Sequence, residues 1–104
     1  MTKETEKALK ILYCEYKKRR KSGNSKSTAM EFESDSIPRI NAFHDWMHED
    51  IQYALRELRA SGYVRIFLYG DVQLTENALE FMEDKPKEFF SSLSGFFDLV
   101  GLFV

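Results

Sequence analysis

The sequence predicts a small α+β domain in which several helices surround a short antiparallel sheet. Apolar residues recur at helical spacing in three separate stretches, over about residues 3–21, 48–61 and 75–84. Between the last two lies a strongly β-prone run, residues 64–69, that returns over residues 72–74. The composition, 43% hydrophobic and 31% charged, is typical of a globular chain, and 104 residues suffice for one core.

The first helix is expected from about Lys3 to Lys21. Acidic residues near its start and a basic run near its end both favour the helix dipole, and Gly23 followed by Asn24 supplies a stop. The only cysteine, Cys14, lies in the apolar part of this helix, so we expect it to pack in the core. The inner stripe consists of Leu9, Leu12, Tyr13 and Tyr16.

A short strand and a second helix are expected next. Thr28, Met30 and Phe32 alternate with Ala29, Glu31 and Glu33, which predicts a half-buried strand. Ser34-Asp35-Ser36 before Ile37-Pro38 is typical of a helix start. That helix is expected to reach about Trp46 and to bury Ile40 and Phe43.

The third helix is expected from about His48 to Ser61, with Gly62 as its C-terminal cap. A strand over residues 64–69 follows, and Gly70-Asp71 is read as a two-residue hairpin turn before the returning strand, residues 72–74. The inner stripe of this helix is Ile51, Ala54, Leu55 and Leu58.

The fourth helix is expected to begin after Thr75 as its cap and to end near Asp84. Leu74 and Leu79 flank that cap at the spacing of a hydrophobic staple. Pro86 then opens a fifth, apolar helix. We therefore divide the chain into a domain over residues 1–84 and an apolar C-terminal helix over residues 85–104.

In this order the elements are helix, strand, helix, helix, hairpin and helix. Residues 50–64 look like the third helix of a winged helix running into its wing, and residues 74–82 look like the exit from the wing. Over roughly residues 5–84 the chain resembles the small winged-helix (winged helix-turn-helix) proteins of Gram-positive bacteria and their phages, including the YjcQ-like group. The resemblance implies either DNA binding or a protein-interaction role, since the fold serves both.

The DNA-binding hypothesis depends on the outer face of the third helix, which would enter the major groove. Glutamine can pair with adenine and arginine with guanine, whereas Glu49 and Asp50 at the leading end oppose a phosphate backbone. The hairpin offers only Arg65. Expected base or phosphate contacts on this helix are Gln52, Tyr53, Arg56 and Arg59, and expected phosphate contacts elsewhere are Lys17, Lys18, Arg19, Arg20, Lys21 and Lys26.

Charge is distributed unevenly along the chain. The net charge is only −2, and those six cations between residues 17 and 26 leave nine basic residues against seventeen acidic residues elsewhere. The basic run therefore predicts local phosphate binding, and the alternative is a solvated helix end.

The C-terminal residues are unusually aromatic, with five of the nine phenylalanines between residues 89 and 104. An apolar surface of this size predicts an interface, and a homodimer is the leading interpretation. The alternatives are packing on the first helix of the same chain and a membrane contact, although the stretch is too short to span a bilayer. The expected interface residues are Phe89, Phe90, Leu93, Phe96, Phe97 and Val100.

No catalytic constellation is evident, so we expect no enzyme and no cofactor. His44 and His48 lie four residues apart but lack the rest of a zinc motif, so no metal is expected. The polar N-terminus lacks the apolar core of a secretory signal, which favours a cytoplasmic protein. The leading hypothesis is a dimeric, sequence-specific regulator that binds double-stranded DNA. The alternative is a non-enzymatic protein–protein interaction module with the same fold.

Overall fold

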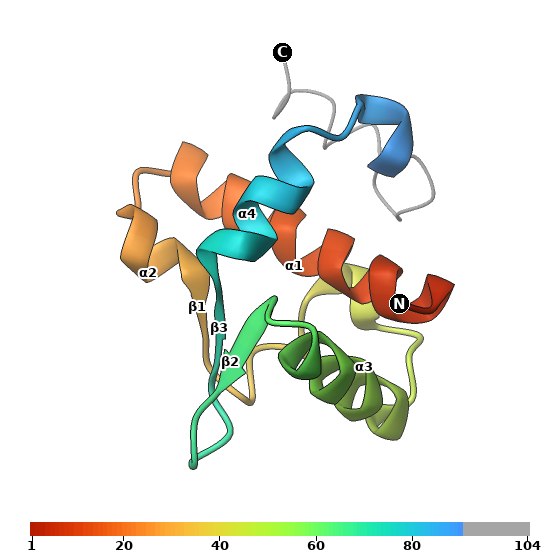
Figure 1. Cartoon of the computed structure of the whole chain (residues 1–104). Helices are drawn as coiled ribbons and strands as arrows, with labels where there is room; N and C mark the ends of the chain where they lie inside the picture. Colours follow the sequence, from red (N-terminus) through yellow and green to blue (C-terminus); the bar gives the residue numbers. More distant parts are fainter. Residues whose placement is uncertain (91–104) are drawn as a thin grey trace.

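Four α-helices and a three-stranded antiparallel sheet make up residues 1–90, the part of the chain that the computed structural model describes (Figure 1). This is the α+β class that the sequence predicts, and the layout is compatible with a winged helix. No helix among these residues is long and apolar enough to cross a membrane. The helices are α1 (Lys3–Lys21), α2 (Lys26–Met30), α3 (His48–Ala60) and α4 (Glu76–Glu83); the strands are β1 (Glu31–Phe32), β2 (Val64–Ile66) and β3 (Val72–Leu74); two 3₁₀ turns are η1 (Asn41–Phe43) and η2 (Lys87–Phe90).

Helix α1 has the bounds that the sequence predicts, and the other helices pack around it (Figure 1). The Thr2 side chain caps its start by accepting a hydrogen bond from the Thr5 N–H. Its end is closed by Gly23, whose φ of 101° is a left-handed conformation that glycine adopts without strain. The predicted stripe is confirmed, because Leu9, Leu12, Tyr13 and Tyr16 are all buried.

The strand predicted over residues 28–32 is mostly wrong. Ser25 accepts a hydrogen bond from the Thr28 N–H and starts the short helix α2, so only Glu31 and Phe32 are left to form β1. Ala29 and Met30, which are neighbours in sequence, are both buried while Thr28 is exposed. The burial pattern is therefore helical up to Met30 rather than alternating.

The second predicted helix, from Ile37 to Trp46, is also wrong. This segment is a series of tight turns in which several N–H groups donate to the carbonyl three residues earlier, as between Phe43 and Ile40 and between Trp46 and Phe43. Only residues 41–43 form a regular 3₁₀ turn. Phe43 is buried as expected, Ile40 is partly buried, and the Trp46 ring packs edge-on against Phe43 at 5.0 Å between centroids.

The sheet has the strand order β1-β3-β2, so both outer strands pair with β3. Side chains alternate between its two faces: Phe32, Val64 and Val72 point into the core. The opposite face carries a cross-strand row of Glu31, Gln73 and Arg65.

The hairpin turn lies earlier in the chain than the sequence predicts. Strand β2 ends at Ile66, and the Phe67 N–H donates to the Asp71 carbonyl while the Gly70 N–H donates to the Phe67 carbonyl. Leu68 and Tyr69 are therefore at the tip, and Gly70 closes the turn with a φ of 93°. The expected Gly70-Asp71 turn and the strand extending to Tyr69 are both wrong.

Helices α3 and α4 have nearly the predicted bounds. Ile51, Ala54, Leu55 and Leu58 are buried, and Gly62 caps the end of α3 with a φ of 82°. Thr75 caps α4: its Oγ1 accepts from the Ala78 N–H and donates to the Gly62 carbonyl. The residues of the expected staple, Leu74 and Leu79, are both buried.

After α4 the chain makes the single 3₁₀ turn η2 where the sequence predicts the start of a fifth α-helix. Phe90 is completely buried and stacks on Tyr13 of α1, with 5.9 Å between ring centroids. This part of the C-terminal stretch therefore packs on the first helix of its own chain. The remainder of the predicted helix, residues 91–104, lies outside the described residues.

Candidate nucleic-acid interface

The outer face of α3 is the first candidate surface. Burial of Ile51, Leu55 and Leu58 turns the remaining side chains of the helix outward. Tyr53 is 55% exposed and Arg56 is exposed. A shallow hollow of about 420 Å³ runs along this face and is lined by His48, Glu49, Asp50, Gln52, Tyr53 and Arg56.

A second hollow, of about 870 Å³, lies between the end of α3, the hairpin and the start of α4. Arg59 lines it from α3 and Arg65 from β2, because the turn at Gly62 sets the strand directly beside the end of the helix. Both arginines are exposed, and neither makes an ion pair with a residue of the described chain. Strand alternation places the Arg65 side chain outward, so its position beside Arg59 could have been predicted from the sequence.

The acidic start of α3 lies on the same surface as the predicted contacts. Met47, at the N-cap position, provides no side-chain hydrogen bond to the helix. Glu49 and Asp50, both exposed, therefore stabilise the first turn through the helix dipole. Any anion approaching along this end of α3 meets these two carboxylates first.

The basic run of α1 is not brought to this surface. The Thr5 hydroxyl, in the first turn of α1, donates to the Glu57 carboxylate of α3, so α3 packs on the N-terminal half of α1 (Figure 1). Lys18 lies thirteen residues further along, about 20 Å at 1.5 Å per residue. The last turn of α1 lies beside α2 and β1 instead (Figure 1).

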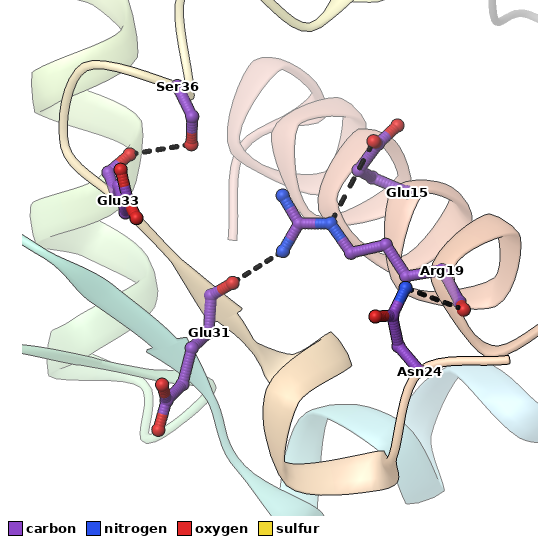
Figure 2. Close-up of polar contacts among 6 residues, drawn as sticks. All are labelled: Glu15, Arg19, Asn24, Glu31, Glu33 and Ser36. Carbon is purple, nitrogen blue, oxygen red and sulfur yellow. Dashed lines mark hydrogen bonds and ion pairs between the residues drawn. The ribbon is translucent and has the colours of Figure 1, made fainter. Parts of the chain in front are cut away.

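Several cations of this run have structural partners. Arg19 donates to the Glu31 carbonyl of β1 and lies 3.9 Å from a Glu15 carboxylate oxygen (Figure 2). Its guanidinium also lies over the Phe32 ring, 4.3 Å from the centroid. Arg20 donates to the Asn24 carbonyl. Lys26 pairs with Glu76 of α4 at 3.0 Å, and this contact raises the pKa of Lys26.

The three remaining lysines of the run differ in their surroundings. Lys17 and Lys21 also interact within the protein, and Lys18 is exposed. The basic run therefore serves the fold at several positions.

The expected interface residues are described only in part. Phe90 is buried within the chain, and Phe89 is partly buried with the Lys10 ammonium 3.9 Å from its ring centroid. Leu93, Phe96, Phe97 and Val100 lie outside the described residues.

The groups that could suggest metal binding or nucleophilic chemistry have ordinary structural surroundings. The His44 Nδ1 lies 2.7 Å from the Asn41 carbonyl oxygen. Within residues 1–90, no three His, Cys, Asp or Glu side chains gather as they would around a metal. Burial raises the pKa of Cys14 to about 12, so its thiol stays protonated at neutral pH.

No protein-family model matches the chain, and comparisons with curated proteins and with solved structures found no match either.

Proposed function

We propose that this protein is a winged-helix DNA-binding protein, a small transcriptional regulator that places α3 in the major groove. The observation that carries the proposal is the exposed face of α3, where Gln52 and Arg56 stand side by side on one hollow. Arg59 and Arg65 are further exposed arginines that line the neighbouring hollow between the end of α3 and the hairpin.

Each side chain has a role that follows from its chemistry. Gln52 can form two hydrogen bonds to adenine, and Arg56 can form two to guanine. Arg59 and Arg65, which flank the turn at Gly62, bind phosphates on the adjoining backbone. Glu49 and Asp50 repel phosphates at the other end of α3, so they favour one orientation of the helix in the groove.

The proposal includes a homodimer, because two copies would read two half-sites about 34 Å apart.

The phosphate contacts predicted for Lys17–Lys21 belong to a separate patch at the far end of α1. Lys18 is the strongest candidate there, since it is exposed and Arg19 and Arg20 make contacts within the chain.

The test begins with selection of a preferred duplex from a random pool, followed by fluorescence anisotropy on that duplex and on a random one. Arg56→Ala is expected to weaken binding to the selected duplex by about tenfold to a hundredfold, as loss of one bidentate base contact costs about 1–3 kcal/mol. Binding to the random duplex is expected to change little.

Arg39→Ala is the matched control, because Arg39 is an exposed arginine in the loop between β1 and α3. It removes the same charge and is expected to leave both affinities unchanged. Equal losses on the two duplexes for Arg56→Ala would contradict base readout by α3. Absence of binding to any duplex at low salt would contradict the function itself.

One observation favours a protein-interaction module as the second candidate. Three of the exposed large apolar residues, Phe67, Leu68 and Tyr69, are consecutive at the hairpin tip. Large exposed apolar patches on soluble proteins often mark interaction surfaces. This tip is not explained by phosphate binding.

A further inference from the structure

A hollow of about 550 Å³ lies on the β1 side of the hairpin, and none of its lining residues lines the two hollows of α3. Its walls come from three segments far apart in sequence: the end of α1, the strand β1 with the loop after it, and the hairpin. Figure 2 shows the first two of these walls, with Arg19 facing Glu31 and with Ser36 against Glu33.

Two aromatic rings form the hairpin wall of this hollow. Phe67 and Tyr69 lie nearly parallel, with 5.8 Å between centroids and 8° between ring planes. They are 38% and 72% exposed, so both residues are accessible to a ligand. The electron-rich face of an aromatic ring attracts a cation.

The charged side chains around the hollow are two carboxylates, those of Glu33 and Asp71, and one cation, Arg19. Glu31 contributes its backbone carbonyl, which accepts from Arg19, while its side chain lies on the opposite face of the sheet in register with Gln73 (Figure 2). Arg19 is already engaged by the Glu31 carbonyl, the Phe32 ring and the Glu15 carboxylate. The Glu33 carboxylate has no ion-pair partner among the described residues. Charge complementarity therefore favours a cationic occupant.

The rim of the hollow is held in place. One Asp71 carboxylate oxygen accepts a hydrogen bond of 2.9 Å from the Ser34 N–H, which ties the hairpin to the loop after β1. At Gly70 the two segments approach so closely that a Cβ would lie 3.3 Å from the Ser34 Cβ. The aromatic wall and the acidic wall are therefore held in a fixed relative position. Little free energy is needed to order them when a ligand binds.

We propose that this hollow binds an arginine side chain of a partner protein. A planar guanidinium can lie flat on the Tyr69 ring and donate to Glu33 and Asp71 at its edge, which a lysine ammonium cannot do. A nucleic acid is disfavoured here because its phosphates would meet the carboxylates of Glu33 and Asp71. Apolar residues next to that arginine would cover the fully exposed Leu68 at the tip. The inference is independent of DNA binding by α3.

The test uses the full chain labelled with ¹⁵N and two small probes, N-acetyl-arginine amide and N-acetyl-citrulline amide. The probes have nearly the same shape, but citrulline carries no charge. Titration followed by NMR is expected to shift the amides of Ser36, Tyr69 and Asp71, with the citrulline probe about fivefold weaker, since exposed cation–π and ion-pair contacts are individually weak. Glu33→Gln and Tyr69→Ala are each expected to weaken the arginine probe by roughly two- to threefold.

Glu49→Gln is the matched control, because it removes an exposed carboxylate from α3 rather than from the hollow. It is expected to leave the shifts at Ser36 and Tyr69 unchanged. Equal binding of the two probes, or shifts centred on the acidic start of α3, would overturn the proposal. So would a random DNA duplex that shifts the amides of the hollow more than those of α3, since the occupant would then be a nucleic acid.

Discussion

At the scale of single residues, Phe90 shows how the C-terminal stretch contributes to the core. Its ring is completely buried, stacks on Tyr13 and meets the Phe89 ring edge-on at 5.3 Å. Replacing it with alanine removes a large buried ring and leaves a cavity. We expect Phe90→Ala to lower the free energy of unfolding by about 3–5 kcal/mol, measured by urea denaturation.

Leu68→Ala is the control for that substitution, because Leu68 is a large apolar residue that is fully exposed. Its effect on stability should stay within about 0.5 kcal/mol. If Phe90→Ala were as mild as Leu68→Ala, the packing of η2 on α1 would be wrong. Phe90 would then belong to the exposed interface that the sequence predicts.

Arg19 illustrates what the sequence could not show about the candidate site. Within the basic run it is indistinguishable from its neighbours, and all five were expected to bind phosphate. Its partners, the Glu31 carbonyl and the Phe32 ring, lie on a strand more than ten residues away. Tertiary structure decides which cations of the run make contacts within the fold. The order of charges along the chain does not reveal those contacts.

At the scale of elements, Thr75 connects the end of helix α3 to the start of helix α4. Its hydroxyl caps α4 through the Ala78 N–H and binds the Gly62 carbonyl at the end of α3. Thr75→Ala removes both hydrogen bonds, so we expect a loss of about 1–2 kcal/mol in the free energy of unfolding. Thermal or urea denaturation of the two proteins measures it.

Thr75→Ser retains the hydroxyl and should recover most of that stability. A serine variant as unstable as the alanine variant would assign the loss to the missing methyl group instead. The double role of Thr75 also explains why this boundary was predicted correctly. Local capping chemistry and tertiary contact favour the same residue there.

The elements that were predicted wrongly are those in which local signals compete. Over residues 28–32, alternation favoured a strand, but the Ser25 cap is enough to begin a short helix that buries Ala29 and Met30. Over residues 37–46, apolar residues recur at every third position, which is the period of a 3₁₀ helix rather than 3.6. That spacing, Ile37, Ile40, Phe43 and Trp46, was a readable signal for the turns observed.

The hairpin tip was misplaced for a related reason. Phe67, Leu68 and Tyr69 have strong β propensity, so the strand was extended through them. Propensity of this kind reflects side chains packed on a sheet, and here the three side chains are exposed instead. Two of these residues, Phe67 and Tyr69, line the hollow that we propose to bind a partner protein.

At the scale of the whole molecule, the exposed arginines and the acidic hollow lie on different sides of the hairpin. Arg56, Arg59 and Arg65 lie along α3 and the β2 side, where Glu49 and Asp50 share the α3 hollow, and the carboxylates of Glu33 and Asp71 lie around the hollow on the β1 side. The net charge of −2 does not reveal this arrangement. The outer face of α3 was predictable from helical periodicity, whereas the acidic hollow, assembled from three distant segments, was not.

Two of the buried ionisable groups on α1, Tyr13 and Cys14, make the stability of the fold depend on pH in the alkaline range. Burial raises the pKa of Tyr13 from 10.0 to about 12 and that of Cys14 from 9.0 to about 12. Both groups are neutral when protonated, so the folded chain keeps its protons at pH values where the unfolded chain loses them. The free energy of unfolding should therefore hold through pH 8 and fall as pH rises from about 9 toward 12.

The variant Cys14→Ala separates the two contributions. Each group contributes a slope of about 1.4 kcal/mol per pH unit while only its unfolded form is deprotonated. Between pH 9 and 10 Cys14 alone is in that range, and between pH 10 and 12 Tyr13 adds to it. Urea denaturation at intervals from pH 7 to 11 should thus show a shallower decline in the variant, with the difference beginning near pH 9. Parallel declines in the two proteins would mean that the Cys14 thiol is not protected by burial in the folded state.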